Sequence, residues 1–214
     1  TLYYTIYHDQ NVILRHQKLE NIGTDYFYIN NIQSMSLELP SMNWDCISFY
    51  GAHAAEANLS RFPLHHGIQR IESRRGSSSP NYQPFFSIVS PDTNVSQGEI
   101  YAMHLVYSGN FLAQAEMDQF GCVRMQIGIH PDEFIWKLDP KAVFESPEAV
   151  LVYTDQGLNG MSHIFHRLYR EHLIPKQFVN QNRPVLLNSW EAMYWDVTMD
   201  KLERQMKLAA KAGI

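Results

Sequence analysis

The chain has 214 residues, with 17 Lys and Arg against 22 Asp and Glu, so its formal net charge is −5. Hydrophobic residues make up 45% of it, a composition that excludes a disordered or fibrous protein. The negative charge and the lack of a Lys/Arg stripe argue against a nucleic-acid partner. No apolar run reaches the ~20 residues needed to span a membrane. Two distant cysteines, Cys46 and Cys122, exclude a disulfide scaffold and a zinc ribbon.

Both ends of the chain look like cuts through regular structure. Residues 1–7 form a strand-like run that starts without Met, and Ile214 would begin a new strand after the helix terminator Gly213. We therefore expect the chain to be a fragment of a longer protein.

Residues 1 to about 153 predict short strands, because aromatic and β-branched residues recur between turn-forming Gly, Asn, Asp and Pro. The predicted strands are 2–6, 11–19, 26–29, 34–39, 85–89, 99–107, 111–118, 123–129, 134–138 and 149–153. Residues 108–110 are predicted to join two of them as a hairpin loop, and residues 119–121 to join the next two. Repeated hairpins with few helical patterns indicate a large antiparallel sandwich.

A loop rich in Gly, Ser and Pro is predicted at residues 72–84, with Arg74 and Arg75 side by side. Two arginines beside glycine and serines could cradle a phosphate or sulfate. The alternative is an ordered surface loop whose arginines pair with carboxylates. No helix N-terminus or glycine-rich fingerprint supports the phosphate site, so the second interpretation is favoured.

The pattern changes after residue 156. Apolar residues recur at helical spacing over residues 161–173, and Pro175 ends this helix. The polar connector that follows is the best candidate for a domain boundary. We expect a sandwich domain over residues 1–156, a linker helix and connector over 157–182, and a different domain over 183–214.

That last segment predicts an unfinished βαβ unit. Residues 185–190 are continuously apolar, which is typical of a strand buried on both faces of a parallel sheet. Thr198 or Asp200 would cap the helix 201–211 that follows. A (β/α) barrel is the simplest container for this unit, and a doubly wound sheet is the alternative.

Ten histidines raise the question of a metal site. His163 and His166 share one face of the predicted helix, but zinc requires a third ligand, and the chain has no His-Glu-x-x-His pattern. No nucleophilic-serine elbow or reactive-cysteine motif is present either. We predict no metal and no cofactor.

The C-terminal end of the predicted apolar strand is the best candidate for a ligand-binding site. In a parallel barrel, Asn188, Trp190, Glu191 and Tyr194 would lie at the face where active sites form. Trp190 could stack on the apolar face of a sugar ring, while Asn188 and Glu191 bond its hydroxyl groups. A packing role for Trp190 and Trp195 and an ion-pair role for Glu191 explain the spacing equally well.

Five motifs, read in order, resemble the α-galactosidases of glycoside hydrolase family 36, in particular the bacterial, lactobacillus-type members. They are residues 72–78 (ESRRGSS), 107–114 (YSGNFLAQ), 118–121 (DQFG), 155–162 (DQGLNGMS) and 183–192 (RPVLLNSWEA). The resemblance implies an N-terminal β-supersandwich, a linking helix, a catalytic (β/α)8 barrel and a C-terminal β-domain. This chain would cover the later part of the supersandwich, the linker, and the first strand and helix of the barrel.

The resemblance also implies retaining hydrolysis of terminal α-galactosides such as melibiose and raffinose, by two carboxylates roughly 5 Å apart. The family's catalytic aspartates lie on later barrel strands, so no catalytic residue is expected in residues 1–214. Trp190 matches the family's tryptophan at the mouth of the active site, with Asn188 and Glu191 as its neighbours. Ser189 stands where the family usually has a second asparagine.

A cytoplasmic homotetramer is the assembly that the resemblance implies. Two alternatives to the α-galactosidase remain open. One is a non-catalytic sugar-binding or oligomer-assembly module. The other is a mutarotase-like activity, which would require a His and a Glu that converge in one cleft.

Overall fold

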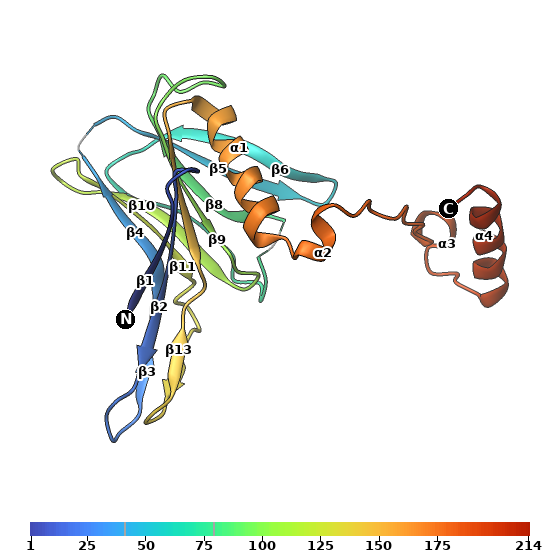
Figure 1. The fold of residues 1–214 in the computed structure, drawn as a ribbon, viewed down its shortest axis with the longest axis horizontal. Helices are drawn as coiled ribbons and strands as arrows, with labels where there is room; N and C mark the ends of the chain where they lie inside the picture. Colours follow the sequence, from blue (N-terminus) through green and yellow to red (C-terminus); the bar gives the residue numbers. More distant parts are fainter. Residues whose placement is uncertain (41, 79) are drawn as a thin grey trace. The chain divides into compact units, whose positions relative to one another are not determined.

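The structure is a computed structural model that describes residues 1–40, 42–78 and 80–214 (Figure 1). The chain divides into two compact units, residues 1–169 and residues 170–214. The larger unit consists mostly of strands, and the regular structure of the smaller unit is helical. Among the described residues, no helix is long and apolar enough to cross a membrane.

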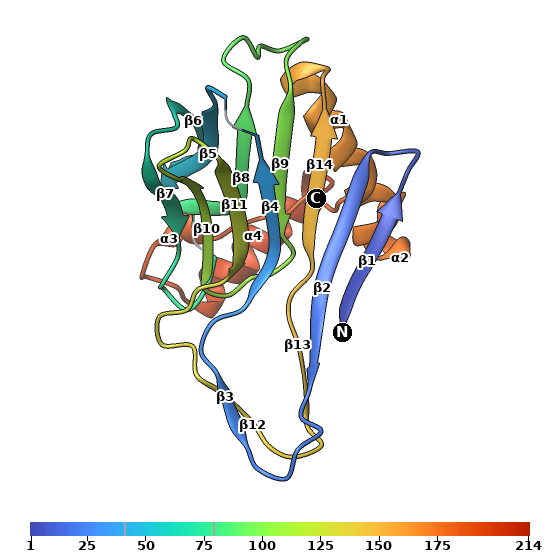
Figure 2. The same cartoon turned by 90° about the vertical axis from the view of Figure 1, so that its left-hand side faces the viewer.

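The larger unit contains an eight-stranded sheet whose paired strands are antiparallel (Figure 2). The strands run in the order β1–β2–β14–β9–β8–β5–β6, and β13 pairs with β2 off this path. Their bounds are Leu2–Tyr7 for β1, Val12–Glu20 for β2, Asp45–Ala52 for β5, Ala55–Pro63 for β6, Tyr82–Val89 for β8, Ile100–Leu105 for β9, Val143–Glu145 for β13 and Ala149–Thr154 for β14.

A three-stranded antiparallel sheet forms the second layer, in the order β10 (Phe111–Met117), β11 (Val123–Ile129), β4 (Gln33–Leu39). Strand β7 (Gly67–Glu72) lies beside β10. The predicted antiparallel sandwich is therefore confirmed. A two-stranded ribbon made of β3 (Phe27–Ile29) and β12 (Trp136–Leu138) projects from the sandwich (Figure 2).

Side chains alternate along the central strands and fill one apolar cluster on each face of the large sheet. On β9, Met103 and Leu105 belong to the core between the two sheets, while Ile100 and Ala102 belong to the cluster on the opposite face. Burial of each large apolar side chain stabilises the fold by about 1.5–3 kcal/mol. The core between the sheets also holds the fully buried Phe86, Phe111, Met125 and Ile127.

Helix α1 (Gly157–Leu168) covers the opposite face of the large sheet. Its residues Met161, Phe165 and Leu168 are buried at helical spacing, and the Phe165 ring meets the Phe85 ring at 5.7 Å. Gly157 starts the helix at φ +64°, where a Cβ would lie 2.5 Å from backbone atoms of Asn94 and Gln97 in the loop between β8 and β9. A glycine is therefore required there.

The helix predicted over residues 161–173 is confirmed, with different ends from those predicted. It begins at Gly157 rather than at residue 161, because Gly157 turns the chain directly out of β14. It continues as a π-helix over Tyr169–Leu173, and Pro175 precedes a short helix α2 (Lys176–Val179).

One predicted hairpin is confirmed and the other is wrong. Residues 119–121 do join the antiparallel pair β10 and β11, with Gly121 at φ +81°. Residues 108–110 instead connect β9 of the large sheet to β10 of the small sheet. The glycine and asparagine that suggested a hairpin serve a crossover between layers, because Phe111 must turn into the core between the sheets.

Strands β5, β6, β7 and β13 were not predicted from the sequence. Strand β6 lies at the edge of the large sheet, and most of its residues are exposed, so it carries no hydrophobic alternation. The predicted loop 72–84 is correspondingly shorter, because β7 ends at Glu72 and β8 begins at Tyr82. Ser79 of that loop lies outside the described residues.

The smaller unit contains helices α3 (Trp190–Met193) and α4 (Met199–Lys211). The predicted cap of α4 is confirmed, because the Thr198 hydroxyl accepts the Lys201 backbone N–H. The predicted strand at residues 185–190 is not present as a strand. A parallel strand takes its hydrogen bonds from neighbouring strands, and residues 170–214 contain none.

A part-buried polar pair lies where α1 ends. The Tyr169 hydroxyl and Nδ1 of His104 on β9 share a hydrogen bond of 2.8 Å, and the rings of Phe165 and Tyr169 meet the imidazole edge-on. Burial lowers the pKa of His104 to about 4 from its usual 6.5. The folded protein therefore holds this imidazole neutral.

We predict an acid-dependent loss of stability from His104. Between about pH 6.5 and pH 4 the unfolded chain binds a proton at His104 that the folded protein does not. The free energy of unfolding should therefore fall as the pH drops, by up to roughly 1.4 kcal/mol per pH unit from this group. Urea unfolding at several pH values measures the slope. In His104→Asn the slope should be shallower over this range, and an unchanged slope would contradict the assignment.

Candidate functional site

The residues predicted to contact a ligand come together around helix α3. The side-chain oxygen of Asn188 accepts the Trp190 backbone N–H at 2.8 Å, and Ser189 begins the helix. Asn188 thus fixes the first turn of α3 through its oxygen. Its amide nitrogen is the group that can donate to a hydroxyl.

Two aromatic rings pack edge-on against the Trp190 ring. The ring centroids of Tyr194 and Trp195 lie 5.5 and 5.1 Å from that of Trp190, both nearly perpendicular to it. The Tyr194 hydroxyl also donates to Oε2 of Glu191 at 3.2 Å. Trp190 keeps 43% of its surface exposed, so the braced ring is open to a ligand. Edge-to-face packing of this kind is the favoured geometry for aromatic pairs.

Tyr194 occupies an unusual backbone conformation. Its φ is 46° and its ψ is −117°, and the Asp196 backbone N–H donates to the Met193 carbonyl at 2.9 Å. These angles and this hydrogen bond define a type II′ turn with Tyr194 at its first central position, where glycine is the favoured residue. A bulky residue there costs about 1–3 kcal/mol. Sequence reasoning missed the turn, because tyrosine carries no turn signal.

An exposed aromatic face, one carboxylate and one amide are suited to binding a neutral, hydroxyl-rich molecule. They do not suffice for glycoside hydrolysis, which requires two carboxylates on either side of the bond. The next carboxylate along the chain, Asp196, pairs with the Lys201 ammonium. The α3 cluster, made of Asn188, Trp190, Glu191, Tyr194 and Trp195, therefore offers groups suited to a neutral ligand but a single carboxylate.

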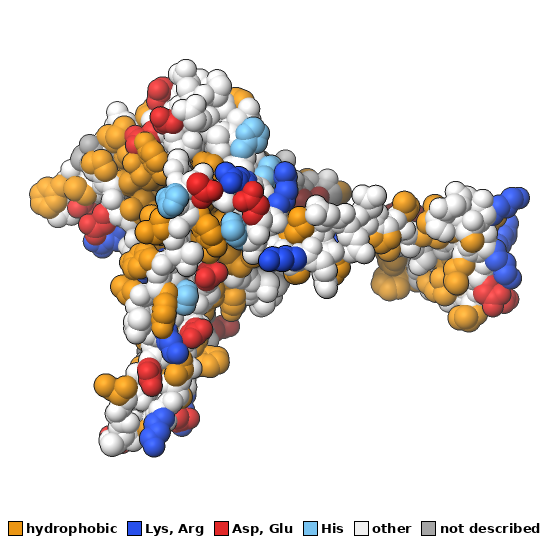
Figure 3. Space-filling model, in the orientation of Figure 1, with side chains coloured by type: hydrophobic (Ala, Val, Ile, Leu, Met, Phe, Trp, Pro, Cys, Tyr) orange, Lys and Arg blue, Asp and Glu red, His pale blue; other side chains and the backbone are white. Residues whose placement is uncertain are grey.

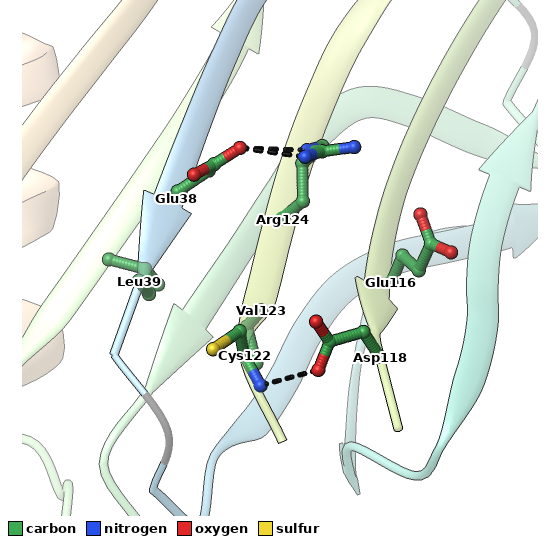
Figure 4. A pocket seen from close by; sticks show the side chains of 7 residues that line it. All are labelled: Glu38, Leu39, Glu116, Asp118, Cys122, Val123 and Arg124. Atoms are coloured by element: carbon green, nitrogen blue, oxygen red, sulfur yellow. Dashed lines mark hydrogen bonds and ion pairs between the residues drawn. The ribbon is translucent and has the colours of Figure 1, made fainter. Parts of the chain in front are cut away.

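The larger unit has a shallow cavity of about 360 Å³ at one end of the small sheet (Figure 4). Of the carboxylates that line it, those of Glu38 and Asp118 are engaged in the fold. Glu38 pairs with Arg124 on the neighbouring strand at 2.7 Å, and Asp118 accepts the backbone N–H groups of Phe120 and Cys122 in the β10–β11 turn. None of the described residues that line this cavity is aromatic, so they provide no platform for a sugar ring.

Glu72 and His130 form the His–Glu pair that a mutarotase-like activity would require, at 3.1 Å. The Asp132 backbone N–H donates to Nδ1 of His130, so Nε2 carries the proton and donates to Glu72. Burial opposes ionisation of Glu72. Hydrogen bonds from His130 and Arg74 and the charge of Arg70 outweigh it, and they hold the pKa of Glu72 below its usual value. His130 is only 2% exposed, and the partly exposed Glu72 carboxylate is held by His130, Arg70 and Arg74, so neither group is free to act on a sugar.

The predicted carboxylate pairing of the 72–84 loop is confirmed for Arg74. Its guanidinium donates to both Glu72 and Asp132, at 2.7–2.9 Å. The loop is therefore fixed to the sandwich by ion pairs.

His163 and His166 both lie on the exposed side of α1. Within the described ranges, no three His, Cys, Asp or Glu side chains gather in a way that could hold a metal ion.

Comparison with known proteins assigns the chain to a family. Residues 1–139 match the glycosyl hydrolase family 36 N-terminal domain, and residues 143–214 match the melibiase domain. The chain belongs to glycoside hydrolase family 36. Its larger unit is thus the mostly antiparallel β-domain of that family.

The family 36 relatives are much longer than this chain. α-Galactosidase AgaA of Geobacillus stearothermophilus is 45% identical over all 214 residues, which span 29% of its length. The crystal structure of the α-galactosidase from Lactobacillus brevis superposes with a TM-score of 0.94 at 41% identity, covering 100% of this chain and 29% of that one. Variants of AgaA have also been crystallised with raffinose and with stachyose, with TM-scores of 0.92 and 44% identity. The raffinose complex covers 98% of this chain and 29% of that one, and the stachyose complex covers 100% and 30%.

We predict that the Glu72 network stabilises the sandwich. Glu72→Gln removes the charge that pairs with Arg74 and Arg70 and weakens the hydrogen bond to buried His130, so the free energy of unfolding should fall by about 1–3 kcal/mol in urea. Glu38→Gln is the matched control, because it breaks the exposed pair with Arg124 and should change stability little. Equal effects of the two substitutions would contradict this ranking.

Proposed function

We propose that this chain acts as part of an α-galactosidase, which hydrolyses terminal α-linked galactose from oligosaccharides of the melibiose and raffinose type with retention. The observation that carries the proposal is the identity of 45% with AgaA over the whole chain, with the melibiase match over residues 143–214. The complexes of AgaA variants with raffinose and stachyose support the substrate class. The two catalytic carboxylates would lie on barrel strands outside these 214 residues.

The proposed domain organisation is the later part of a β-supersandwich over residues 1–156, a linker helix and connector over 157–182, and the start of the (β/α)8 barrel over 183–214. The exposure of Val185, Leu186 and Leu187 supports the barrel. Leu186 alone leaves 86% of its surface in water. An apolar run of this kind requires neighbours on both faces, which the inner strands of a barrel have.

Within this enzyme, Trp190, Asn188 and Glu191 would form part of the sugar-binding site. The braced, exposed ring of Trp190 would cover the apolar face of a sugar, and the amide and carboxylate would bond its hydroxyl groups. Retaining hydrolysis by two carboxylates needs no cofactor. We also propose a cytoplasmic location and no membrane or nucleic-acid partner.

We predict that Trp190→Ala in the longer enzyme lowers kcat/KM for an aryl α-galactoside by about 10–100-fold, because the lost stacking contact is worth on the order of 1–3 kcal/mol. Steady-state kinetics measure the effect. The 214 residues alone should show no turnover, since they lack the catalytic pair. Unchanged kcat/KM in Trp190→Ala would remove this residue from the site.

Assembly into a homotetramer is a second proposed role of the β-domain. The ribbon of β3 and β12 carries the exposed large side chains Tyr26, Tyr28 and Ile135, with 52% of Tyr28 in water. Buried Asn21 holds the ribbon through hydrogen bonds to the Asp25 and Leu138 carbonyls. On the face drawn in Figure 3, hydrophobic, acidic and basic side chains are intermixed along this ribbon, as at protein interfaces.

We predict that the double substitution Tyr28→Ser and Ile135→Ser weakens self-association of the longer enzyme about tenfold or more, because it removes two aromatic or aliphatic contacts from the ribbon. Light scattering over a dilution series measures the molar mass. Tyr50→Ser, an exposed tyrosine on β5, is the matched control. An unchanged mass at every concentration would contradict a role of the ribbon in assembly.

A further inference from the structure

Tyr194 occupies a turn position that favours glycine, although its side chain gains little from burial. Its φ of 46° is accessible to glycine without strain, whereas a bulky residue is strained there. The side chain is 54% exposed, so hydrophobic burial does not account for a tyrosine at this position. The explanation has to come from the groups that the side chain contacts.

Those groups are the two residues of α3 that the sugar-binding proposal uses. The ring of Tyr194 lies 5.5 Å from the Trp190 ring at an angle of 73°, and its hydroxyl donates to Glu191 at 3.2 Å. Its backbone N–H also donates to the Trp190 carbonyl at 2.7 Å. One residue therefore contacts Trp190 through both ring and backbone, and Glu191 through its hydroxyl.

We propose that Tyr194 is a positioning residue for α-galactoside binding, and this inference rests on the proposed function. The turn directs the tyrosine back over α3, where its ring restricts the rotation of the Trp190 side chain and its hydroxyl orients the Glu191 carboxylate. Side chains that are held in place before binding lose less conformational freedom when the ligand arrives. Tyr194 itself need not touch the sugar.

Because Tyr194 is strained in this turn, a substitution by glycine can distinguish a positioning role from a purely structural one. In Tyr194→Gly the backbone relaxes, so the thermal midpoint of the longer enzyme should stay the same or rise, while the contacts to Trp190 and Glu191 are lost. KM for melibiose and for an aryl α-galactoside should then rise about tenfold, with a smaller change in kcat. A residue that only stabilised the fold would give the reverse pattern, a lower midpoint and an unchanged KM, and that result would overturn the proposal.

Tyr194→Phe isolates the hydroxyl. It keeps the ring beside Trp190 and removes only the hydrogen bond to Glu191, so KM should rise by about 2–10-fold, the loss expected for one hydrogen bond. Tyr50→Phe is the matched control, because it removes an exposed phenol hydroxyl from β5 and should leave KM unchanged. Equal KM values in Tyr194→Phe and the unsubstituted enzyme would overturn the role of the hydroxyl.

A double-mutant cycle distinguishes failure of this inference from failure of the proposed function. If Tyr194 acts through Trp190, Tyr194→Gly should add little to the KM of Trp190→Ala, so the two effects are not additive. Additive effects would overturn the positioning role and leave the sugar site in place. If Trp190→Ala has no effect on binding, the proposed site itself is wrong.

Discussion

Both faces of the large sheet must be buried, and the rest of the larger unit depends on this requirement. The central strands β8, β9 and β14 place apolar side chains on each face in alternation. The small sheet covers one face, and α1 covers the other with Met161, Phe165 and Leu168. The transfer of these side chains out of water is the main favourable contribution to folding. Covering this face also requires Gly157, which begins α1 and turns the chain back over the sheet after β14.

The same burial controls the chemistry of the polar groups inside the sandwich. His104 is held neutral by its apolar surroundings, and Glu72 stays ionised because His130, Arg74 and Arg70 all surround it. Groups that are this fully satisfied are structural, since neither can offer a free base or acid to a ligand. The α3 cluster differs from these groups in two ways. Its aromatic rings are exposed to solvent, and its backbone is strained at Tyr194. Sites of binding commonly show this combination.

Sequence reasoning predicted the strands whose side chains alternate, such as residues 123–129, and the helix that follows the last strand. It missed β5, β6 and β7. For the edge strand β6 the reason is that most of its residues are exposed and carry no apolar pattern. Of the candidate site, Trp190, Asn188 and Glu191 were predicted from their position at the end of the apolar run and from the resemblance to a family motif. The turn at Tyr194 could not be predicted, since a tyrosine at a glycine position has no local signature.

The sequence by itself determined the family, the antiparallel sandwich and the helical linker. These features depend on hydrophobic alternation, turn residues and short motifs. Such patterns are local, so they can be recognised in the sequence alone. Only the tertiary structure decided that β9 and β10 belong to different layers, that Glu72 pairs with buried His130, and that Tyr194 reaches back to Trp190 and Glu191. Each of these features is a contact between residues in space. Which contacts form depends on how segments that are distant along the chain pack together.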